Sequence, residues 1–250
     1  MKKVSLLSAL VWLASASMAQ ATGMVPDSSV VLVNVADGEG TITVKNTDDR
    51  PRLLYTSMYD LPEDNAHLLV VTPPVARVEA GQSQLVRFIV DSKEPIATER
   101  MKRVVFEGIP EAEKGKNQVS ITLRQDLPVV IHPANLPRKN DPWTLLQWTR
   151  DGDKLVVTNP SPYVVRMTQL LQLLPGKQTL DLPKPYVLPG ATLTIDASKV
   201  KDALGSTTQL RISPASLYGY AVDSYDAPLL SKPAAVAPAA SAPAAVQKAG

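Results

Sequence analysis

Residues 72–90 read TPPVARVEAGQSQLVRFIV, and this stretch combines turn signals with a strand signal. Pro73-Pro74 and Ala80-Gly81 favour turns, because proline fixes φ and glycine adopts backbone conformations that other residues avoid. The run QLVRFIV at residues 84–90 is rich in β-branched and aromatic side chains, which is typical of a β-strand. The stretch therefore predicts short strands separated by tight turns.

Runs of the same kind recur on both sides of this stretch, with further turns between them, such as the one at Asp37-Gly38. They are SVVLVNV (29–35), TITVKN (41–46), RLLYTSMY (52–59), HLLVV (67–71), RVVFEG (103–108) and QVSITLRQ (118–125). About seven short strands spaced by turns are typical of an immunoglobulin-like β-sandwich. We predict one such domain over residues 22–131.

A second, weaker strand pattern follows a segment with three prolines, HPANLPRKNDP at residues 132–142, which we interpret as a short hinge. The pattern predicts a second β-sandwich over residues 143–227, with a hairpin turn at Asp151-Gly152-Asp153. Within it, Pro160 and Pro162 predict a rigid corner between two strands, since neither has an N–H for a sheet. Residues 228–250 become Ala/Pro-rich and are expected to be a disordered tail. The predicted fold class is all-β: two immunoglobulin-like β-sandwich domains joined by a short Pro-rich hinge.

The beginning of the chain has the pattern of a secretory signal peptide. Lys2 and Lys3 precede the apolar run VSLLSALVWLASA, and small residues follow at Ala19-Gln20-Ala21. The apolar run is shorter than the roughly 20 residues that a membrane span needs. We therefore predict a signal peptide over residues 1–21, export of the rest, and no insertion into the membrane. The chain contains no Cys, so its core must be held by packing without disulfides.

Several classes of function find no support in the composition. The net charge is +2 with acidic and basic residues well mixed, which does not indicate nucleic-acid binding. His67 and His132 are isolated in the sequence, and no metal-ligand spacing, G-x-S-x-G elbow, P-loop or dinucleotide fingerprint is present. We interpret each histidine as a surface or strand-end residue. The expectation is a protein that is not an enzyme and has no cofactor or metal site.

The aromatic side chains leave an alternative function open, that of a secreted structural or adhesive immunoglobulin-like protein that binds sugar. A sugar-binding patch would use exposed aromatic rings, and Trp143, Trp148, Tyr55 and Tyr59 are the candidates. Packing in a core or at the hinge is the interpretation that we favour for these four residues.

Four stretches, taken in order, are similar to PapD-like periplasmic chaperones of the chaperone–usher pathway. They are TPPVARVEAGQSQLVRF (72–88), Glu99 with a strand ending in Ile109-Pro110, an apolar run ending in His132-Pro133, and TNPSPYVV (158–165). The resemblance covers most of the chain that follows the predicted signal peptide. It implies a chaperone of the periplasm that binds pilus or fimbrial subunits and delivers them to an outer-membrane usher.

The resemblance also implies that the last strand of the first domain is lent to an incomplete subunit, a mode called donor-strand complementation. Apolar and polar residues alternate on that strand, and its subunit-binding residues would be Asn117, Val119, Ile121, Leu123 and Gln125. Without the resemblance, the three apolar residues would be interpreted as ordinary core positions of the chain's own sandwich. An exposed strand edge also leaves self-association of the free protein open.

The sequence departs from the usual family pattern at a pair of cations. The resemblance implies an Arg on the first strand and a Lys on the donor strand, which hold the carboxylate of the subunit. Here SSVVLVNV contains no Arg, and the expected Lys position falls on Pro128. The chain thus resembles a divergent, archaic or alternative branch of these chaperones. Arg87, Arg103 and Arg124 are candidates for a replacement anchor, although ordinary solvated strand charges are the favoured interpretation of each.

Overall fold

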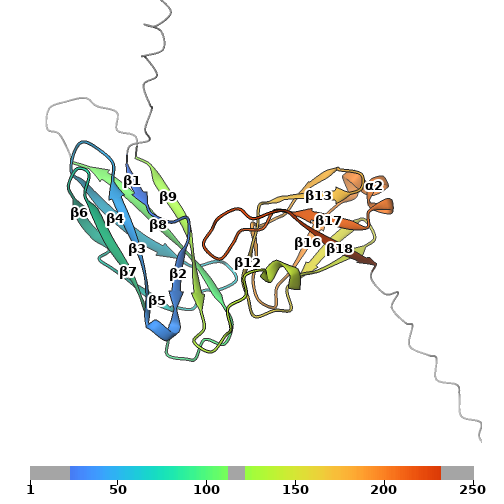
Figure 1. The fold of residues 1–250 in the computed structure, drawn as a ribbon, viewed down its shortest axis with the longest axis horizontal. Coiled ribbons are helices and arrows are strands. Elements are labelled where there is room, and N and C mark those ends of the chain that lie inside the picture. Colours follow the sequence, from blue (N-terminus) through green and yellow to red (C-terminus); the bar gives the residue numbers. More distant parts are fainter. Residues whose placement is uncertain (1–22, 112–121, 232–250) are drawn as a thin grey trace, which may run out of the picture. The chain divides into compact units, whose positions relative to one another are not determined.

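The structure is a computed structural model that describes residues 23–111 and 122–231. The chain divides into two compact units (Figure 1). The first unit runs as far as Asn140 and also includes residues 162–164 and 216–220. The second unit consists of residues 141–161, residues 165–215 and the chain from Ala221 onward.

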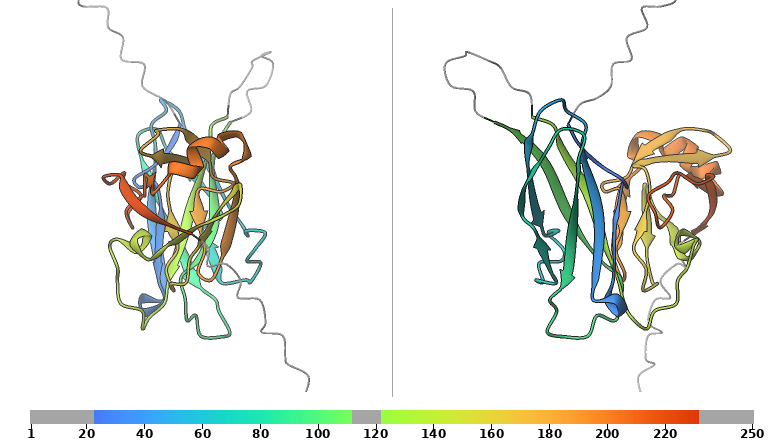
Figure 2. Two further views of the ribbon diagram at one scale, coloured as in Figure 1. Left: turned by 90° about the vertical axis from the view of Figure 1, so that its right-hand side faces the viewer. Right: turned by 60° about the vertical axis from the view of Figure 1, so that its left-hand side comes forward.

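The first unit is built around one curved nine-stranded sheet. Its strands are β1 (Met24–Pro26), β2 (Val31–Asn34), β3 (Glu39–Asn46), β4 (Arg52–Tyr59), β5 (Leu69–Thr72), β6 (Val75–Val78), β7 (Ser83–Val90), β8 (Arg100–Pro110) and β9 (Arg124–His132), with the 3-10 helix η2 (Val35–Asp37) after β2. The strand order is β5-β7-β3-β2-β9-β8-β4-β6, and β1 pairs with β3. Figure 2 shows the long strands of this unit standing side by side. Because β2 joins the two halves of the path, strand β9 lies in the interior of the sheet order.

Period-two alternation builds the core of this unit. In β3 every second residue is buried, and Val86 and Phe88 of the neighbouring β7 face the same core. Each fully buried side chain of this size stabilises the fold by roughly 1.5–3 kcal/mol. The core also includes Val129 and Ile131 of β9, so the second half of β9 is part of the unit's own packing.

Two glycines meet specific backbone demands. Gly81 has a φ of +72° and lies in the turn between β6 and β7, which confirms the turn predicted at Ala80-Gly81. Gly40 lies where β3 passes close to β2, and a Cβ there would come within 2.2 Å of the carbonyl oxygen of Leu32. A larger residue at position 40 would therefore push these two strands apart.

Most of the strands predicted for the first domain are present. The predicted runs at 41–46, 52–59, 67–71, 84–90 and 103–108 correspond to β3, β4, β5, β7 and β8. The structure adds β1 and β6, which the sequence pattern did not single out. Of the predicted strand at 118–125, Arg124 and Gln125 begin β9, Thr122 and Leu123 precede it, and the residues up to Ile121 lie outside the described part.

The second unit holds a seven-stranded sheet in the order β14-β13-β17-β18-β10-β11-β16 and a separate pair, β12-β15. Its elements are η3 (Pro142–Leu145), β10 (Gln147–Asp151), β11 (Lys154–Thr158), β12 (Val165–Arg166), β13 (Leu170–Leu174), β14 (Thr179–Asp181), β15 (Tyr186–Val187), β16 (Thr192–Asp196), η4 (Ser198–Val200), α2 (Lys201–Ser206), β17 (Gln209–Ile212) and β18 (Tyr225–Ser231). β18 runs parallel to β10 and antiparallel to β17. The all-β fold with two sandwich-like units is confirmed.

Two local predictions for the second unit are confirmed. A tight turn at Gly152, whose φ is +61°, joins β10 to β11 and pairs Asp151 with Lys154. The chain leaves β11 at Thr158 and re-enters a strand only at Val165, as expected for a proline-containing corner. The corner is fixed by Asn159, whose side-chain oxygen accepts hydrogen bonds from the N–H and hydroxyl of Ser161. Among the described residues, no helix is long and apolar enough to cross a membrane.

The aromatic residues considered for a sugar-binding patch do not share one environment. Trp148 is fully buried in the core of the second unit, and Trp143 packs against that core. Tyr55 and Tyr59 are exposed on β4 of the first unit. Packing is therefore the role of the two tryptophans, as favoured from the sequence.

A candidate polypeptide-binding edge on strand β9

Strand β9 changes its pairing along its length. On one side, residues Arg124–Ile131 pair antiparallel with β8. On the other side, only Val129–His132 pair, in parallel, with Val31–Asn34 of β2. In the described part of the chain, residues 124–128 therefore have one strand neighbour. Their other side is an open backbone edge, the kind of edge that pairs readily with a further strand.

Pro128 lies at the point where this change occurs. It pairs with Arg103 of β8, and the next residue, Val129, begins the pairing with β2. Proline has no N–H to give to a sheet, so it is tolerated in a strand where one edge is not needed. Pro128, the residue at the expected Lys position, thus marks the end of the open edge.

One stripe of side chains passes from the core to the surface along this strand. Ile131 and Val129 are fully buried, and Leu127 packs against the same core with part of its surface exposed. Leu123, just before the strand, is 50% exposed. Alternation places these odd-numbered residues on one face where the strand is regular. The interpretation of Leu123 as an ordinary core residue is therefore wrong, since half of its surface is accessible.

The other predicted donor-strand residues divide between the described and undescribed parts. Asn117, Val119 and Ile121 lie outside the described residues. Gln125 is the second residue of β9, within the open edge, and is half-buried. Its side-chain Nε2 donates a 2.7 Å hydrogen bond to the carbonyl oxygen of Met24, which ties β9 to β1.

The three arginines considered as a replacement anchor each have a carboxylate partner. Arg103 of β8 donates from Nε to Asp126 Oδ1 at 2.9 Å and from Nη2 to the Asp126 carbonyl at 3.0 Å. Tyr59 donates a hydrogen bond to the same carboxylate. Burial, as the larger cause, and this hydrogen bond both raise the pKa of Tyr59. Asp126 is thus a shared acceptor that holds β4, β8 and β9 together.

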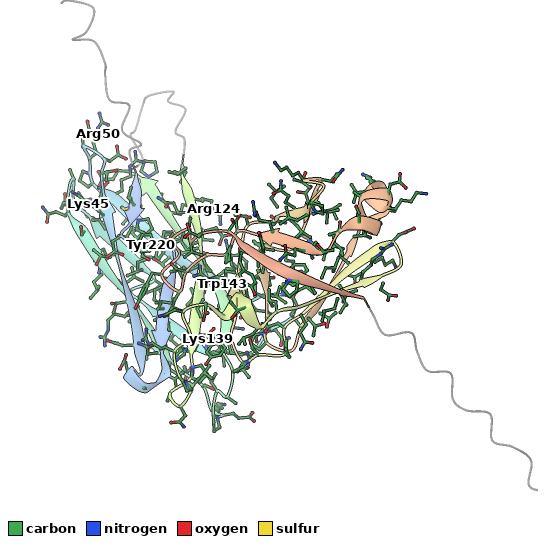
Figure 3. The ribbon with its side chains drawn as sticks, turned by 45° about the vertical axis from the view of Figure 1, so that its right-hand side comes forward. Lys45, Arg50, Arg124, Lys139, Trp143 and Tyr220 are labelled. Atoms are coloured by element: carbon green, nitrogen blue, oxygen red, sulfur yellow. The ribbon has the colours of Figure 1, made fainter. Side chains whose placement is uncertain are left out.

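Of the remaining two arginines, Arg124 has a longer contact with its carboxylate, and Arg87 lies on another strand. Arg124 Nε lies 3.4 Å from Glu107 Oε2, and the Arg124 side chain is 63% exposed (Figure 3). Arg87, on β7, donates from Nε to Glu39 at 2.8 Å. Strand β7 is not a neighbour of β9 in the sheet, so the three arginines do not form one cluster. Arg124 is the one that lies on the strand with the open edge.

His132, at the end of β9, is buried and bonded on both ring nitrogens. Its Nδ1 lies 2.8 Å from Glu99 Oε1, and its Nε2 lies 2.9 Å from the Leu136 carbonyl oxygen. Glu99 Oε2 accepts the N–H of Val164 at 2.7 Å, within the same unit. The prediction of a strand-end position is confirmed, but the surface alternative is wrong for His132. His67 is an exposed residue, 3.6 Å from Asp91.

Sequence reasoning missed a second buried ionic group, at the start of β8, the strand that directly follows Glu99. Lys102 is only 1% exposed, and its Nζ lies 2.8 Å from Asp60 Oδ1 and 2.7 Å from the Asp64 carbonyl oxygen. Arg100 also binds Asp64. Burial alone would raise the pKa of Asp64, but the hydrogen bonds from Arg100 and Lys102 outweigh it and lower that pKa. The charges of 60-DLPED-64 in the sequence were the available signal.

Among the described residues, no group of three His, Cys, Asp or Glu side chains is arranged to hold a metal ion. What the first unit offers instead is a half-paired strand with an accessible leucine beside it. This arrangement defines a class: β-proteins that can take an extended polypeptide onto an open sheet edge.

Comparison with known proteins agrees with that class. The family model for the pili and flagellar-assembly chaperone PapD N-terminal domain matches residues 23–137, and that for the pili assembly chaperone PapD C-terminal domain matches residues 141–226. The chain is 47% identical over 206 residues to the uncharacterized fimbrial chaperone YhcA of Escherichia coli strain K12, which covers 82% of this chain and 90% of that one. The chain therefore belongs to the PapD family of pili assembly chaperones.

More distant proteins are similar to this chain in sequence or in fold. The chaperone protein caf1M of Yersinia pestis is 27% identical over 182 residues, covering 63% of this chain and 68% of that protein. The solved structure of the Salmonella enterica SafA pilin with the SafB chaperone matches with a TM-score of 0.69 at 20% identity, over 84% of this chain and 98% of that one. The E. coli chaperone DraB matches with a TM-score of 0.67 at 21% identity, over 82% and 98%.

Proposed function

We propose that this protein is a periplasmic chaperone that binds pilus or fimbrial subunits by lending them the strand that leads into β9. The observation that carries the proposal is the combination at the start of β9: an open backbone edge over residues 124–128 and a half-exposed Leu123 on the approach to it. Membership in the PapD family and the similarity to the fimbrial chaperone YhcA support the same role.

The chemistry of this binding is strand addition. An incomplete β-sandwich exposes a groove and unpaired backbone groups, and a borrowed strand satisfies both. Val119, Ile121 and Leu123 alternate with polar residues, so their side chains would enter the groove while the backbone pairs with the subunit. Burying three such side chains contributes on the order of 5–9 kcal/mol before the cost of ordering the partners is subtracted.

The second half of β9 stays fixed in the chaperone while the preceding strand binds the subunit. Val129 and Ile131 stay in the chaperone core, and Glu99 binds His132 at the strand end. The segment before β9 can therefore pair with a partner while the C-terminal half of β9 remains packed in the chaperone. No nucleotide is required, because the energy is that of completing the subunit fold, and the strand can later be exchanged at an outer-membrane usher.

Other details of the role are part of the same proposal. The predicted signal peptide at residues 1–21 would carry the chain to the periplasm, where subunits and usher meet. Arg124 is the best candidate for a cationic contact with the subunit, since it lies on β9 and its carboxylate partner is at 3.4 Å.

The test is co-expression with a small exported subunit encoded next to the chaperone. Changing Val119, Ile121 and Leu123 together to Thr should abolish co-purification and leave the subunit insoluble or degraded, because Thr cannot fill the apolar groove. The matched control changes Ser120 and Thr122, the alternate positions, to Ala and should co-purify normally. A soluble subunit that co-purifies equally with the triple variant would rule out the donor-strand role of these residues.

A further inference from the structure

A hollow of about 300 Å³ adjoins the open edge of β9, and we call it the β9 hollow. Residues 26–29, which connect β1 to β2, form one wall, and Gln125 and Leu127 of β9 form another. Tyr220, 71% exposed, also lines it. All of these residues belong to the first unit, and Figure 3 labels Tyr220. A polypeptide lying along the open edge of β9 would pass the β9 hollow.

The two serine side chains in the lining of the β9 hollow donate their hydrogen bonds to the protein itself. The Ser28 hydroxyl donates to the Val30 carbonyl oxygen at 2.9 Å, and the Ser29 hydroxyl donates to the Gly219 carbonyl oxygen at 3.2 Å. A hydroxyl has one hydrogen, so both serines can offer only their lone pairs to a ligand. Gln125 commits one amide hydrogen to Met24 and keeps its side-chain oxygen and its second amide hydrogen.

The charge of the lining favours a cationic ligand. Asp27 is the charged residue in the lining, and no Lys or Arg is part of it. Asp27 Oδ1 accepts the Thr43 N–H at 3.3 Å, and its second carboxylate oxygen adds another acceptor. An incoming carboxylate would meet the like charge of Asp27. An incoming cation would meet a carboxylate and several oxygen acceptors.

We propose that the β9 hollow receives the lysine or arginine side chain of the polypeptide that pairs with β9. The inference rests on the proposed function, because it takes that polypeptide to be the bound subunit. Leu127 offers an apolar wall for the aliphatic stem of such a side chain, and the Tyr220 ring offers a face to its cation. The β9 hollow would then select subunits that carry a basic residue at the matching position.

The β9 hollow can be tested without knowing the subunit. Nuclear magnetic resonance titration of the mature chain would use three probes: the N-acetyl amides of arginine, lysine and glutamate. The basic probes should shift the backbone amides of Ser28, Ser29 and Gln125 in a saturable way, and more weakly at about 500 mM salt than at about 50 mM. The glutamate probe should not.

Substitutions locate the effect. Asp27→Asn keeps the acceptor for Thr43 but removes the charge, and it should weaken binding of the arginine probe by about tenfold. The matched control is Asp37→Asn, since Asp37 is also exposed and also accepts one neutral hydrogen bond, from Asn34. It should bind the probe as the unmodified chain does. Equal shifts with the glutamate probe, undiminished binding in Asp27→Asn, or no saturable shift with any probe would overturn the proposal.

Subunit capture separates this inference from the proposed function. If Asp27→Asn captures the subunit with unchanged affinity while the triple Thr variant fails, the β9 hollow does not read a basic side chain but the donor strand stands. If the triple Thr variant captures the subunit normally, the proposed function fails whatever the probes do.

Discussion

Glu99 and His132 form a buried pair 33 residues apart in the chain, with His132 Nδ1 2.8 Å from Glu99 Oε1. The Leu136 carbonyl oxygen, 2.9 Å from Nε2, can only accept, so Nε2 carries a hydrogen. The carboxylate also accepts the Val164 N–H. The pair thus links the end of β9 to the residue that precedes β8 and to Val164 through buried hydrogen bonds.

Removing this carboxylate should destabilise the protein. In Glu99→Ala, His132 Nδ1 and the Val164 N–H both lose a buried acceptor, and we expect the free energy of unfolding to fall by about 3–5 kcal/mol. Glu99→Gln keeps an acceptor oxygen and should lose about half as much. Urea denaturation measures both. Glu94→Ala, at an exposed glutamate, should stay within about 0.5 kcal/mol of the unmodified chain. Equal effects of the Glu99 and Glu94 variants would contradict the structural role of the pair.

Substitutions at the two ends of the stripe along β9 should have different effects, on stability at Ile131 and on subunit binding at Leu123. Ile131→Ala opens a cavity in the core and should lower the free energy of unfolding by about 2–5 kcal/mol. Leu123→Ala should change it by less than about 0.5 kcal/mol, because half of that side chain is already exposed. Leu123→Ala should instead weaken subunit capture in a pull-down titration. If Leu123→Ala destabilised the free chaperone as much as Ile131→Ala, Leu123 would belong to the core.

Asp64 gives the fold a dependence on acid. Its pKa is lowered in the folded state relative to the ordinary value of 3.8, because the hydrogen bonds from Arg100 and Lys102 outweigh its burial. Its stabilising contribution is therefore complete well above pH 3.8 and is lost as the pH falls through the folded pKa. Urea unfolding at pH 7 and at acid pH should show that Asp64→Asn costs stability at neutral pH and less in acid. A cost that grows as the pH falls would have the wrong sign.

Arg124 and Arg87 provide a paired test of the cationic anchor. Arg124 lies on β9, whereas Arg87 lies on β7 beside Glu39. Arg124→Gln should weaken subunit binding about two- to fivefold at low salt, the size expected for an exposed charge contact, and Arg87→Gln should not. The difference should shrink at high salt. Binding that is insensitive to Arg124→Gln at low salt would remove this residue from the interface.

The sequence was sufficient to predict the strands whose pattern is simple. The run at 41–46 alternates regularly, the runs at 52–59 and 84–90 are rich in aliphatic and aromatic residues, and the three became β3, β4 and β7. β1 and β6 were missed because each is very short, and β6 follows directly on the Pro73-Pro74 turn signal. β1 is a strand because it pairs with β3, and β6 because it pairs with β4. The local composition of a segment does not determine such pairing.

The site was only partly predictable, because it too depends on the pairing of strands that are distant in the sequence. The family resemblance singled out Leu123 and Gln125, but only the register of β9 against β2 and β8 shows where the open edge begins. The burial of His132 depends on Glu99, which is distant in sequence and adjacent in space. The β9 hollow is likewise assembled from residues 26–29, β9 and Tyr220, which no local pattern connects.

Hydrogen exchange of the chaperone, free and bound to a subunit, tests the central claim most directly. If the open edge of β9 is the site of strand addition, backbone amides in residues 119–127 should gain protection on binding, and those of Val129–Ile131, already paired on both sides, should change little. A stable complex in which residues 119–127 exchange as fast as in the free chaperone would contradict the account.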